Sequence, residues 1–351
     1  MKKKIFTSFF LLSLSLVSAA QNSSNIHEFY KAKNCDPECI FTYKNITKET
    51  VPYFPTNCST VCAELLINQH CDLTESETTS VFENMKTLFG TLLVISTKFT
   101  STKFLAGLET LECYDSHTVW CFNNEMVEIG MTNFSTMRCE GIYIGQNQKL
   151  ERLNMPNMKT IKPLHHKTLH NRTHIVDITM SLNSPSFCVT TEEMYNFMRI
   201  ETAGVDYIRA NYCEPVLDAN LCKNPGKGCS QIFGDLEVES DLDLESLDSV
   251  EIIFGSLVIK DTNITDFGFL KNFKYVAQLE DKAAIIVKEN PALVNISFPN
   301  LERIRSGARE MVVFAGNNDE LKANSTQCFD LRDKLGLEEW ALRIDGKERG
   351  E

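Results

Sequence analysis

An internal duplication constrains the fold of this chain more than any other feature of its sequence. Residues 88–108 align without a gap with residues 253–273, at an offset of 165, and the two segments share seven identities. A second pair follows in the same order, because residues 142–161 match residues 285–304 at asparagine, leucine and proline positions. Similar segments repeated in the same order predict two related domains.

Short runs of β-forming residues recur through the second copy, with centres 20 to 30 residues apart, over residues 232–238, 253–259, 284–287 and 311–314. A strand and a loop that repeat at this period predict a solenoid, because each turn can bury its apolar side only against its neighbours. The Leu-x-x-Leu-x-Leu pattern of leucine-rich repeats is not sustained here. A more irregular parallel β-helix is therefore favoured.

Certain residue types suit the corners of such turns. Gly90 and Gly255 stand just before strand residues, where a sharp bend favours a residue without a Cβ atom. Asn147 and Asn290 can hydrogen-bond backbone groups that would otherwise be buried without a partner. We predict structural rather than catalytic roles for these four residues.

The N-terminus is typical of a secretory signal peptide over residues 1–20. Three lysines precede an apolar run over residues 5–17, and small residues follow it before Gln21. A membrane anchor is the alternative, but this run of 13 residues is shorter than the roughly 20 that a membrane-spanning helix needs. No later run reaches that length, and residues 343–351 are too polar for a lipid-anchor signal. We expect a secreted, extracellular protein with no membrane span.

Cysteines, sequons and charge agree with export. Thirteen cysteines suit an oxidising compartment. Without the three lysines of the leader, 32 basic residues face 47 acidic ones, a formal charge of −15, so we expect no binding to nucleic acid or to anionic membranes. Eight Asn-x-Ser/Thr sequons predict glycosylation, at Asn22, Asn45, Asn57, Asn133, Asn171, Asn263, Asn295 and Asn324.

A family resemblance rests on four motifs of the second copy, namely Cys229-Ser-Gln-Ile-Phe-Gly-Asp-Leu-Glu-Val, Gly255-x-Leu-x-Ile, Phe269-Leu270 and Asn290-Pro-x-Leu. They resemble the receptor L domain, which occurs in pairs in the ectodomains of the insulin and epidermal growth factor receptors. The resemblance is strong over residues 229–321, moderate over residues 88–213 and poor over residues 35–71. It implies a mainly β fold with short helices, made of two single-stranded right-handed β-helix domains (leucine-rich-repeat-like solenoids) in tandem.

The chain departs from the receptors between and after its two copies. A furin-like cysteine-rich region separates the L domains of the receptors, whereas a short stretch stands here, and no kinase-like segment follows the second copy. We therefore divide the chain into a signal peptide (1–20), an N-terminal cysteine-containing segment (21–61), a first L domain (62–213), a linker (214–228) and a second L domain (229–351).

The two copies differ in length at one place. The spacing from the strand glycine to the next matched strand is 52 residues in the first copy (90–142) and 30 in the second (255–285). We interpret the 22 extra residues as part of a long loop that disulfides crosslink, because this segment contains Cys113, Cys121 and Cys139. A disulfide that closes about 15 residues stabilises a fold by roughly 3 kcal/mol.

Other cysteines suggest a helical cap and an unpaired thiol. A helix with its N-cap at Thr190 or Thr191 is predicted to follow Cys188, which we expect to pair with Cys213 across it. Thirteen is odd, and Cys328 is the candidate for the thiol without an intramolecular partner, available for a disulfide-linked dimer. The alternative is a partner within the chain and a different cysteine left over. Two further disulfide candidates are Cys222 and Cys229.

Two clusters could be mistaken for metal sites. The residues His165, His166, His170 and His174 include an i, i+4, i+8 series, but they fall in an inserted segment with a sequon, so a solvated loop is favoured. The pairs Cys35/Cys39 and Cys58/Cys62 suit two disulfides across a helical hairpin better than zinc, whose thiolates need reducing surroundings. No catalytic or nucleotide-binding motif is present, so we expect a binding protein without cofactor or metal, and not an enzyme.

A ligand face is predicted on the first copy. If Leu92 and Val94 point inward, strand alternation sends Leu93 and Ile95 outward, and Tyr143 lies on the neighbouring turn. An apolar patch with an aromatic residue suits recognition. The alternative is that the inserted segment covers these residues.

Two functions fit this sequence. The first is a secreted protein that recognises an extracellular peptide or protein, and that sequesters an insulin-like or growth-factor-like peptide by family analogy. The second is a structural or adhesive glycoprotein, or a co-receptor, that pairs with membrane receptor ectodomains.

Overall fold

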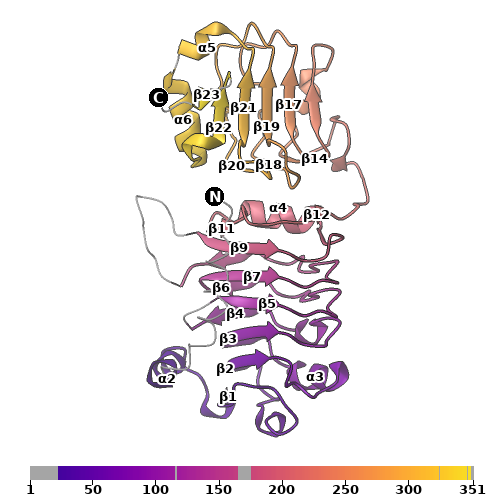
Figure 1. The fold of residues 1–351 in the computed structure, drawn as a ribbon, viewed down its shortest axis with the longest axis vertical. Helices are drawn as coiled ribbons and strands as arrows, with labels where there is room; N and C mark the ends of the chain where they lie inside the picture. The colour runs from indigo at the N-terminus through magenta and orange to yellow at the C-terminus, as the bar shows by residue number, and fades with distance from the viewer. Residues whose placement is uncertain (1–22, 115–116, 165–174, 324, 346, 349–351) are drawn as a thin grey trace.

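The computed structural model describes residues 23–114, 117–164, 175–323, 325–345 and 347–348. Within them the chain is mostly β with short helices, and nearly all strand pairs are parallel. Two stacks of strands follow one another along the chain, the first below and the second above in Figure 1. The predicted signal peptide, the sequons at Asn22, Asn171 and Asn324, and the four clustered histidines lie outside the described residues.

The first stack is a ten-stranded sheet that bends around a corner. β3 pairs with β4 through its first half and with β5 through its second half, so the sheet continues in two directions. Gly90 forms this corner, with φ of +142°, and a Cβ atom there would lie 1.9 Å from the carbonyl oxygen of Ala63. The strands are β1 (Ile40–Phe41), β2 (Thr60–Ile67), β3 (Thr87–Ile95), β4 (Thr110–Cys113), β5 (Thr118–Cys121), β6 (Thr136–Arg138), β7 (Gly141–Gly145), β8 (Thr160–Lys162), β9 (Val176–Ser181) and β11 (Ala203–Gly204).

The second stack is built from two sheets, and each complete turn of the chain adds one strand to each sheet. The five-stranded sheet contains β13 (Leu221–Cys222), β14 (Gln231–Phe233), β16 (Ile252–Phe254), β18 (Tyr275–Ala277) and β20 (Arg303–Arg305). The six-stranded sheet contains β15 (Leu236–Val238), β17 (Leu257–Lys260), β19 (Ile285–Lys288), β21 (Val312–Ala315), β22 (Leu342–Ile344) and β23 (Lys347–Glu348). The last two strands pair in antiparallel fashion.

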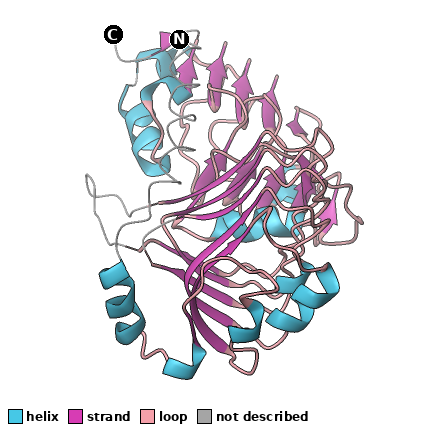
Figure 2. Cartoon of the chain, turned by 60° about the horizontal axis from the view of Figure 1, so that its bottom comes forward, coloured by secondary structure: helices cyan, strands magenta, loops and turns pink. Residues whose placement is uncertain are grey.

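Short helices lie along the outside of the strand stacks (Figure 2). They are α2 (Ser23–Ala32), α3 (Glu75–Phe82), α4 (Thr191–Arg199), α5 (Asp319–Ala323) and α6 (Ser325–Leu335), with 3-10 turns η1 (Pro37–Cys39), η2 (Val51–Tyr53), η3 (Lys103–Leu105), η4 (Leu244–Leu247) and η5 (Glu339–Ala341). A small parallel pair joins β10 (Cys188–Val189) to β12 (Asn211–Tyr212). No helix in the described part of the chain combines the length and the apolar composition that a membrane span requires.

The extra residues of the first copy form an additional coil. β4, β5 and β6 fall in the segment that was predicted to be a crosslinked loop, and β5 lies between β3 and β7 in the sheet. Neighbouring coils are 24 residues apart here, since Thr118 pairs with Ile142. The loop interpretation is wrong, because an insertion of about one coil adds a strand to each side of the stack and leaves the flanking coils in register. The Cys113–Cys139 disulfide joins adjacent coils.

A ladder of asparagines runs along one corner of each stack. The Asn147 side chain is fully buried, accepts the backbone N–H of Asn123 at 3.0 Å, and donates to the side-chain oxygen of Asn183 at 3.2 Å. In the second stack, the Asn290 side chain donates in the same way to that of Asn317 at 2.9 Å. The predicted structural role of Asn147 and Asn290 is confirmed, because their amides satisfy buried polar groups of adjacent coils.

Helix α4 closes the first stack. It begins at the predicted Thr190 N-cap, whose hydroxyl accepts the N–H of Glu193 at 3.1 Å, and the Glu193 carboxylate accepts the N–H of Thr190 at 2.8 Å. The same carboxylate accepts the N–H of Met155 at 2.7 Å, while burial raises the pKa of Glu193. The Cys188–Cys213 disulfide, expected across this helix, is present with 5.0 Å between the Cα atoms.

Replacing Glu193 with alanine should lower the free energy of unfolding by about 2–3 kcal/mol. The substitution removes the acceptor of the Thr190 N–H, which is one half of the capping box, and leaves the buried N–H of Met155 without an acceptor. Chemical denaturation measures the change. Glu192→Ala is the matched control, because Glu192 is exposed in the same helical turn. Equal losses in the two variants would show that the buried carboxylate has no special role.

The five-stranded sheet of the second stack is buried on both faces. Its inner face packs into the core of the second stack, through residues such as Ile253 and Val276. Strands β16 and β18 are buried at every position, as expected for strands covered on both sides. Residues of the outer face belong to the same apolar cluster as the core of the first stack; they are Ile252, Phe254, Tyr275, Ala277 and Leu279. The two stacks therefore pack directly against each other.

Two arginines of β20 cross this interface. The Arg303 guanidinium donates to carbonyl oxygens at the C-terminal end of α4, at 3.3 Å for Phe197 and 2.9 Å for Ile200. Arg305 is fully buried and donates to the carbonyl oxygens of Gln278 and Ile208. Burial lowers the pKa of both, for Arg305 to about 10. The positive charge of Arg303 also complements the negative end of the α4 dipole.

Two nested disulfides hold the N-terminal segment, Cys35–Cys62 and Cys39–Cys58. The four cysteines pair among themselves, as the sequence predicted. The predicted helical hairpin is wrong, because Cys62 lies inside strand β2, whose residues are buried at most positions, and Cys58 just precedes it. β2 pairs with β3 over eight residue positions, so the sheet overrides the helical spacing of these cysteines.

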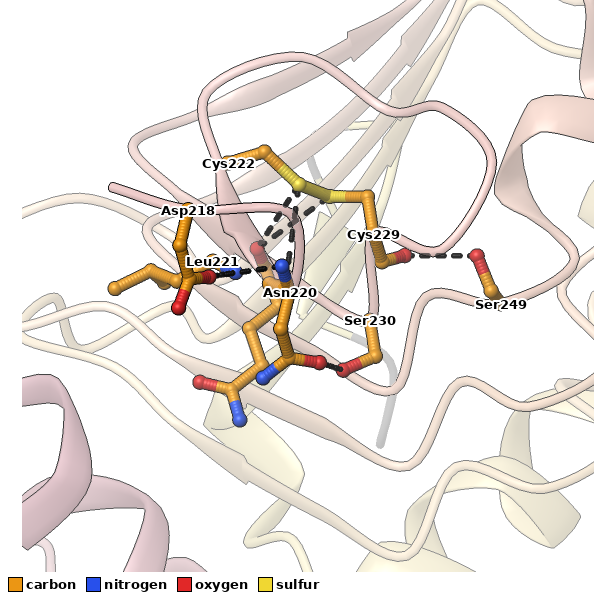
Figure 3. The surroundings of a disulfide bond; sticks show 8 residues. Asp218, Asn220, Leu221, Cys222, Cys229, Ser230 and Ser249 are labelled. Carbon is orange, nitrogen blue, oxygen red and sulfur yellow. Dashed lines mark hydrogen bonds between the residues drawn. A yellow bond between two sulfur atoms is a disulfide. The ribbon is translucent and has the colours of Figure 1, made fainter.

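A tight disulfide loop begins the second stack (Figure 3). Cys222 and Cys229, both disulfide candidates from the sequence, are bonded to each other. Asp218 accepts the backbone N–H of Leu221 at 2.7 Å, and the Ser249 hydroxyl donates to the Cys229 carbonyl at 2.8 Å. β13 then pairs with β14, so part of the segment between the two copies belongs to the five-stranded sheet of the second stack.

Candidate ligand-binding face

An apolar row crosses the outer side of the first stack. In β3 the residues Leu92 and Val94 are buried in the core, while Leu93 and Ile95 are half-buried and face outward, so the predicted alternation is confirmed. Strand pairing extends the position of Leu93 over five strands. We call this set the outer row; its members are Leu66, Leu93, Val119, Tyr143 and Thr179.

The inserted coil contributes to the outer row. Val119 of β5 stands between Leu93 and Tyr143, and only 2% of its surface is exposed. The described residues of the insertion thus extend this side of the sheet by one strand, and the low exposure of Val119 shows that the row is covered at its centre. Sequence reasoning missed Val119 because it treated the insertion as a loop, and it missed Leu66 because the duplication does not extend to β2.

Tyr143 lies along the sheet rather than away from it. A Cβ atom on Gly145 would stand 2.5 Å from the Tyr143 hydroxyl oxygen, so the ring occupies space that glycine leaves open. Gln146 donates to that hydroxyl at 3.4 Å. Two residues further along the strands, Ile95, Cys121 and Gly145 are paired in register and form a second row beside the outer row. Burial raises the pKa of the Cys121 thiol to about 12, so this sulfur stays protonated.

Bulky residues occupy strained corners beside the outer row. The residue after β5 and the residue after β9 both have left-handed backbone, with φ of 57° at Phe122 and 56° at Leu182. Their side chains are 41% and 67% exposed. A left-handed backbone costs roughly 1–2 kcal/mol for most residues and is tolerated best by glycine, asparagine and aspartate. Ser96 and Gln146 have the same left-handed backbone after β3 and β7, and their equivalents in the second stack are Asp261 and Glu289.

The second stack has a shorter apolar row with charged ends. Val258, Ile286 and Val313 are paired in register and half-buried, with Glu237 at one end and Arg343 at the other. The Lys260 amine lies 2.9 Å from a Glu237 carboxylate oxygen and 2.8 Å from one of Glu239. This face is therefore apolar at its centre and acidic at its first edge.

A basic pocket of about 570 Å³ lies between β8 and the end of α4. Arg138, Lys159, Lys162 and Arg199 line it, together with one acidic residue, Glu201. Arg138 is paired with Glu112 at 3.2 Å, whereas no carboxylate of the described residues pairs with the other three cations. All three are exposed, so solvent screens them.

The sequons that the structure describes are accessible. Asn45, Asn57, Asn133, Asn263 and Asn295 are all exposed. Exposure is required for modification of a folded surface, and the predicted glycosylation of these five sites remains a prediction. Among the described residues, no group of three or more histidine, cysteine, aspartate or glutamate side chains is arranged to hold a metal ion.

The structure describes all thirteen cysteines of the chain, and ten of them form five disulfides. Cys71 and Cys121 keep their thiols. Cys328, the predicted site of an intermolecular bond, lies in α6 with 8% of its surface exposed. A buried sulfur can reach a second chain only if α6 moves. The disulfide-linked dimer stays a prediction, which non-reducing electrophoresis tests.

The comparisons with known proteins agree with this architecture. The family described as "Receptor L domain" matches the chain twice, over residues 57–161 and 228–332. "Protein irld-34" of Caenorhabditis elegans is 24% identical over 303 residues, which cover 80% of this chain and 69% of that protein. Both matched segments contain the corner glycine and the asparagine ladder described above. This chain belongs to the receptor L domain family and carries two copies of the domain in tandem.

Proposed function

We propose that this chain is a secreted, glycosylated, non-catalytic protein that binds an extracellular peptide or protein through the outer row of its first L domain. Each copy is taken as a single-stranded right-handed β-helix, over residues 62–213 and 229–351. By analogy with the family, the ligand class is an insulin-like or growth-factor-like peptide, which the protein would sequester. Export is supported by the five disulfides and the two L domains.

The observation that carries this proposal is the pair of strained apolar corners, Phe122 and Leu182. They flank the outer row and expose apolar surface at a backbone conformation that disfavours them. Strain of this kind persists where another requirement outweighs stability, and binding is such a requirement. Ser96 and Gln146 at the other corners of the same stack, and Asp261 and Glu289 in the second stack, show that the fold itself does not need bulky apolar side chains at such corners.

The disulfides support the same proposal, because they hold the coils under the face in place. Cys113–Cys139 links the inserted coil to its neighbour, and Cys188–Cys213 fixes the end of the stack. A rigid face loses little conformational entropy when a ligand binds. Apolar and aromatic side chains on such a face provide most of the binding energy at protein interfaces.

The co-receptor alternative is favoured by the row Val258, Ile286 and Val313 on the second stack. A large ectodomain could contact both apolar rows at once, whereas a small peptide would need one. Capture from extracellular fluid followed by mass spectrometry separates the two functions by the size of the bound partner.

Replacing Phe122 and Leu182 together with asparagine should weaken partner binding at least tenfold, about 1.4 kcal/mol, without loss of stability. Asparagine tolerates the left-handed backbone, so we expect the free energy of unfolding to stay equal or to rise by about 1 kcal/mol. Capture of the partner by immobilised protein and chemical denaturation measure the two quantities.

Glu289→Asn is the control, because it changes a residue of the same left-handed backbone conformation at a corner of the second stack. It should leave partner binding unchanged. Full binding by the Phe122 and Leu182 variant would exclude this face as the ligand site. Loss of binding in Glu289→Asn alone would move the site to the second domain.

A further inference from the structure

A pocket of about 440 Å³ opens beside a predicted glycosylation site on the second domain. Two loops form it, one after β15 and one after β17. Its volume falls within the range of about 300–1,000 Å³ that is typical of ligand pockets. The sequon asparagine Asn263 is itself a lining residue.

One wall of this pocket is apolar. Leu242, Leu244, Ile264 and Phe269 are half-buried, and each packs with one side against the core of the second stack. Their other sides line the pocket. Apolar surface that stays open to water is unfavourable, by about 25 cal/mol for each Å². The wall therefore suits a ligand with an apolar face, and the aromatic ring of Phe269 suits a flat one.

The polar lining selects against anions. Glu239 and Asp266 line the pocket, and no lysine, arginine or histidine is among its lining residues. Asp266 accepts the N–H of Gly268 at 2.7 Å, and Glu239 pairs with Lys260 at 2.8 Å. A carboxylate has about four acceptor positions, so both groups can still accept hydrogen bonds from hydroxyls. The lining thus suits a neutral ligand that carries hydroxyl donors.

Asn263 is held at the edge of the pocket with its side chain available. Its neighbour Thr262 is buried, and the Thr262 hydroxyl and N–H both bond to Asn290 of the asparagine ladder, the N–H at 3.0 Å. The Asn263 side chain is exposed and makes no hydrogen bond to any residue that the structure describes. In Asn45 and Asn295, by contrast, the side-chain oxygen accepts a hydrogen bond.

We propose that this pocket seats the first N-acetylglucosamine of a glycan attached to Asn263. In the attachment, Asn263 Nδ2 forms a bond to C1 of the sugar, the bond from C1 to the pyrophosphate of a lipid-linked donor breaks, and an amide proton leaves with the pyrophosphate. The apolar face of the sugar then contacts Phe269 and Leu242, while its hydroxyls donate to Asp266 and Glu239. A tethered sugar has a high effective concentration, so it competes well with any free ligand.

This inference rests on the proposed export, because glycans of this kind are added in the secretory pathway. A seated glycan would cover apolar wall that otherwise faces water, and it would make the second domain more stable in its modified form. The outer row of the first domain would remain free of it, because Asn263 lies on the second domain.

The test uses the full chain expressed in a secreting eukaryotic host. Mass spectrometry first establishes that Asn263 and Asn133 are occupied. An endoglycosidase should then release the Asn263 glycan from the folded protein about tenfold more slowly than the Asn133 glycan, and at an equal rate after denaturation. Asn133 is the matched comparison, because it is exposed and lines none of the pockets described above.

A second measurement does not depend on the endoglycosidase. Asn263→Gln should lower the melting temperature, Asn133→Gln should not, and Leu242→Ser should remove the resistance of the Asn263 glycan while the chain stays folded. If Asn263 is occupied, but its glycan is released as fast as that of Asn133 and the two Asn→Gln variants melt at the same temperature, the pocket does not hold the sugar. That result would leave the proposed export untouched. A chain that is not secreted, with Asn263 unmodified, would instead overturn the export on which the seat depends.

Discussion

Replacing Arg305 with alanine should lower the free energy of unfolding by about 3–5 kcal/mol. The guanidinium is fully buried and bonds to the carbonyl oxygens of Gln278 and Ile208, one in each domain. Alanine leaves both carbonyls without a donor and opens a cavity in the interface. Chemical denaturation should show the loss as an earlier midpoint of a single transition, because one apolar cluster joins the core of the first domain to the facing side of the second.

Two variants sharpen this result. Arg309→Ala removes an exposed arginine that lies over Trp340 near the same strand, and it should cost less than about 1 kcal/mol. Arg305→Met removes the charge but keeps most of the volume, so it should cost less than Arg305→Ala. A parent chain that unfolds in two separate transitions would contradict the idea of a shared interface.

Replacing Asn147 with alanine should cost about 2–5 kcal/mol, because its amide bonds to four groups of the stack, one of which is the side-chain amide of Asn123. It accepts the N–H of Asn123 at 3.0 Å and donates to the Trp120 carbonyl at 3.1 Å and to Asn183 at 3.2 Å. The first two of these contacts are buried and the third is partly buried. Alanine would leave a buried donor and a buried acceptor without partners in two adjacent coils. Denaturation with urea measures the loss.

Gln148→Ala is the control, since this neighbouring amide is exposed and bonds to the Leu182 carbonyl at 3.4 Å. It should change stability by less than about 0.5 kcal/mol. Asn290→Ala should match the cost of Asn147→Ala, because it occupies the same kind of position in the second stack. A cost no greater than that of Gln148→Ala would show that water replaces the ladder.

The repeating features of this fold were predictable because they follow local rules. The alternation around Leu92 and Leu93 and the N-cap of α4 were both recognised from the residues alone. Each depends on a strand period or a capping hydrogen bond that a few neighbouring residues determine. The disulfide Cys188–Cys213 was expected for the same reason, since it flanks one helix.

The inserted coil was not recognised because a coil and a loop of equal length share their composition. Its strands β5 and β6 are four and three residues long, too short for alternation to stand out. The signal that could have revealed it is the length itself, since 22 residues nearly equal the 24-residue spacing of the adjacent coils. A loop has no reason to match that period.

The interface between the domains was missed because it depends on contacts between residues about a hundred positions apart. Arg303 and Arg305 read as ordinary outward residues of a strand, and nothing near them in sequence shows what they face. The continuous apolar strands Ile252–Phe254 and Tyr275–Ala277 did carry a signal. A strand in which apolar and polar residues do not alternate is covered on both faces. The outer face of an isolated solenoid would not need such a cover.

The way in which the two stacks end also limits how the protein can associate. The last coil of a parallel stack presents unpaired backbone groups, on which another chain could add strands and build fibres. Here α4 and the second domain cover the last coil of the first stack, and β23 turns back against β22 at the end of the second. The first of these ends is covered, and the edge strand at the second, β23, is only two residues long, so both ends offer little backbone to a chain that would add a strand.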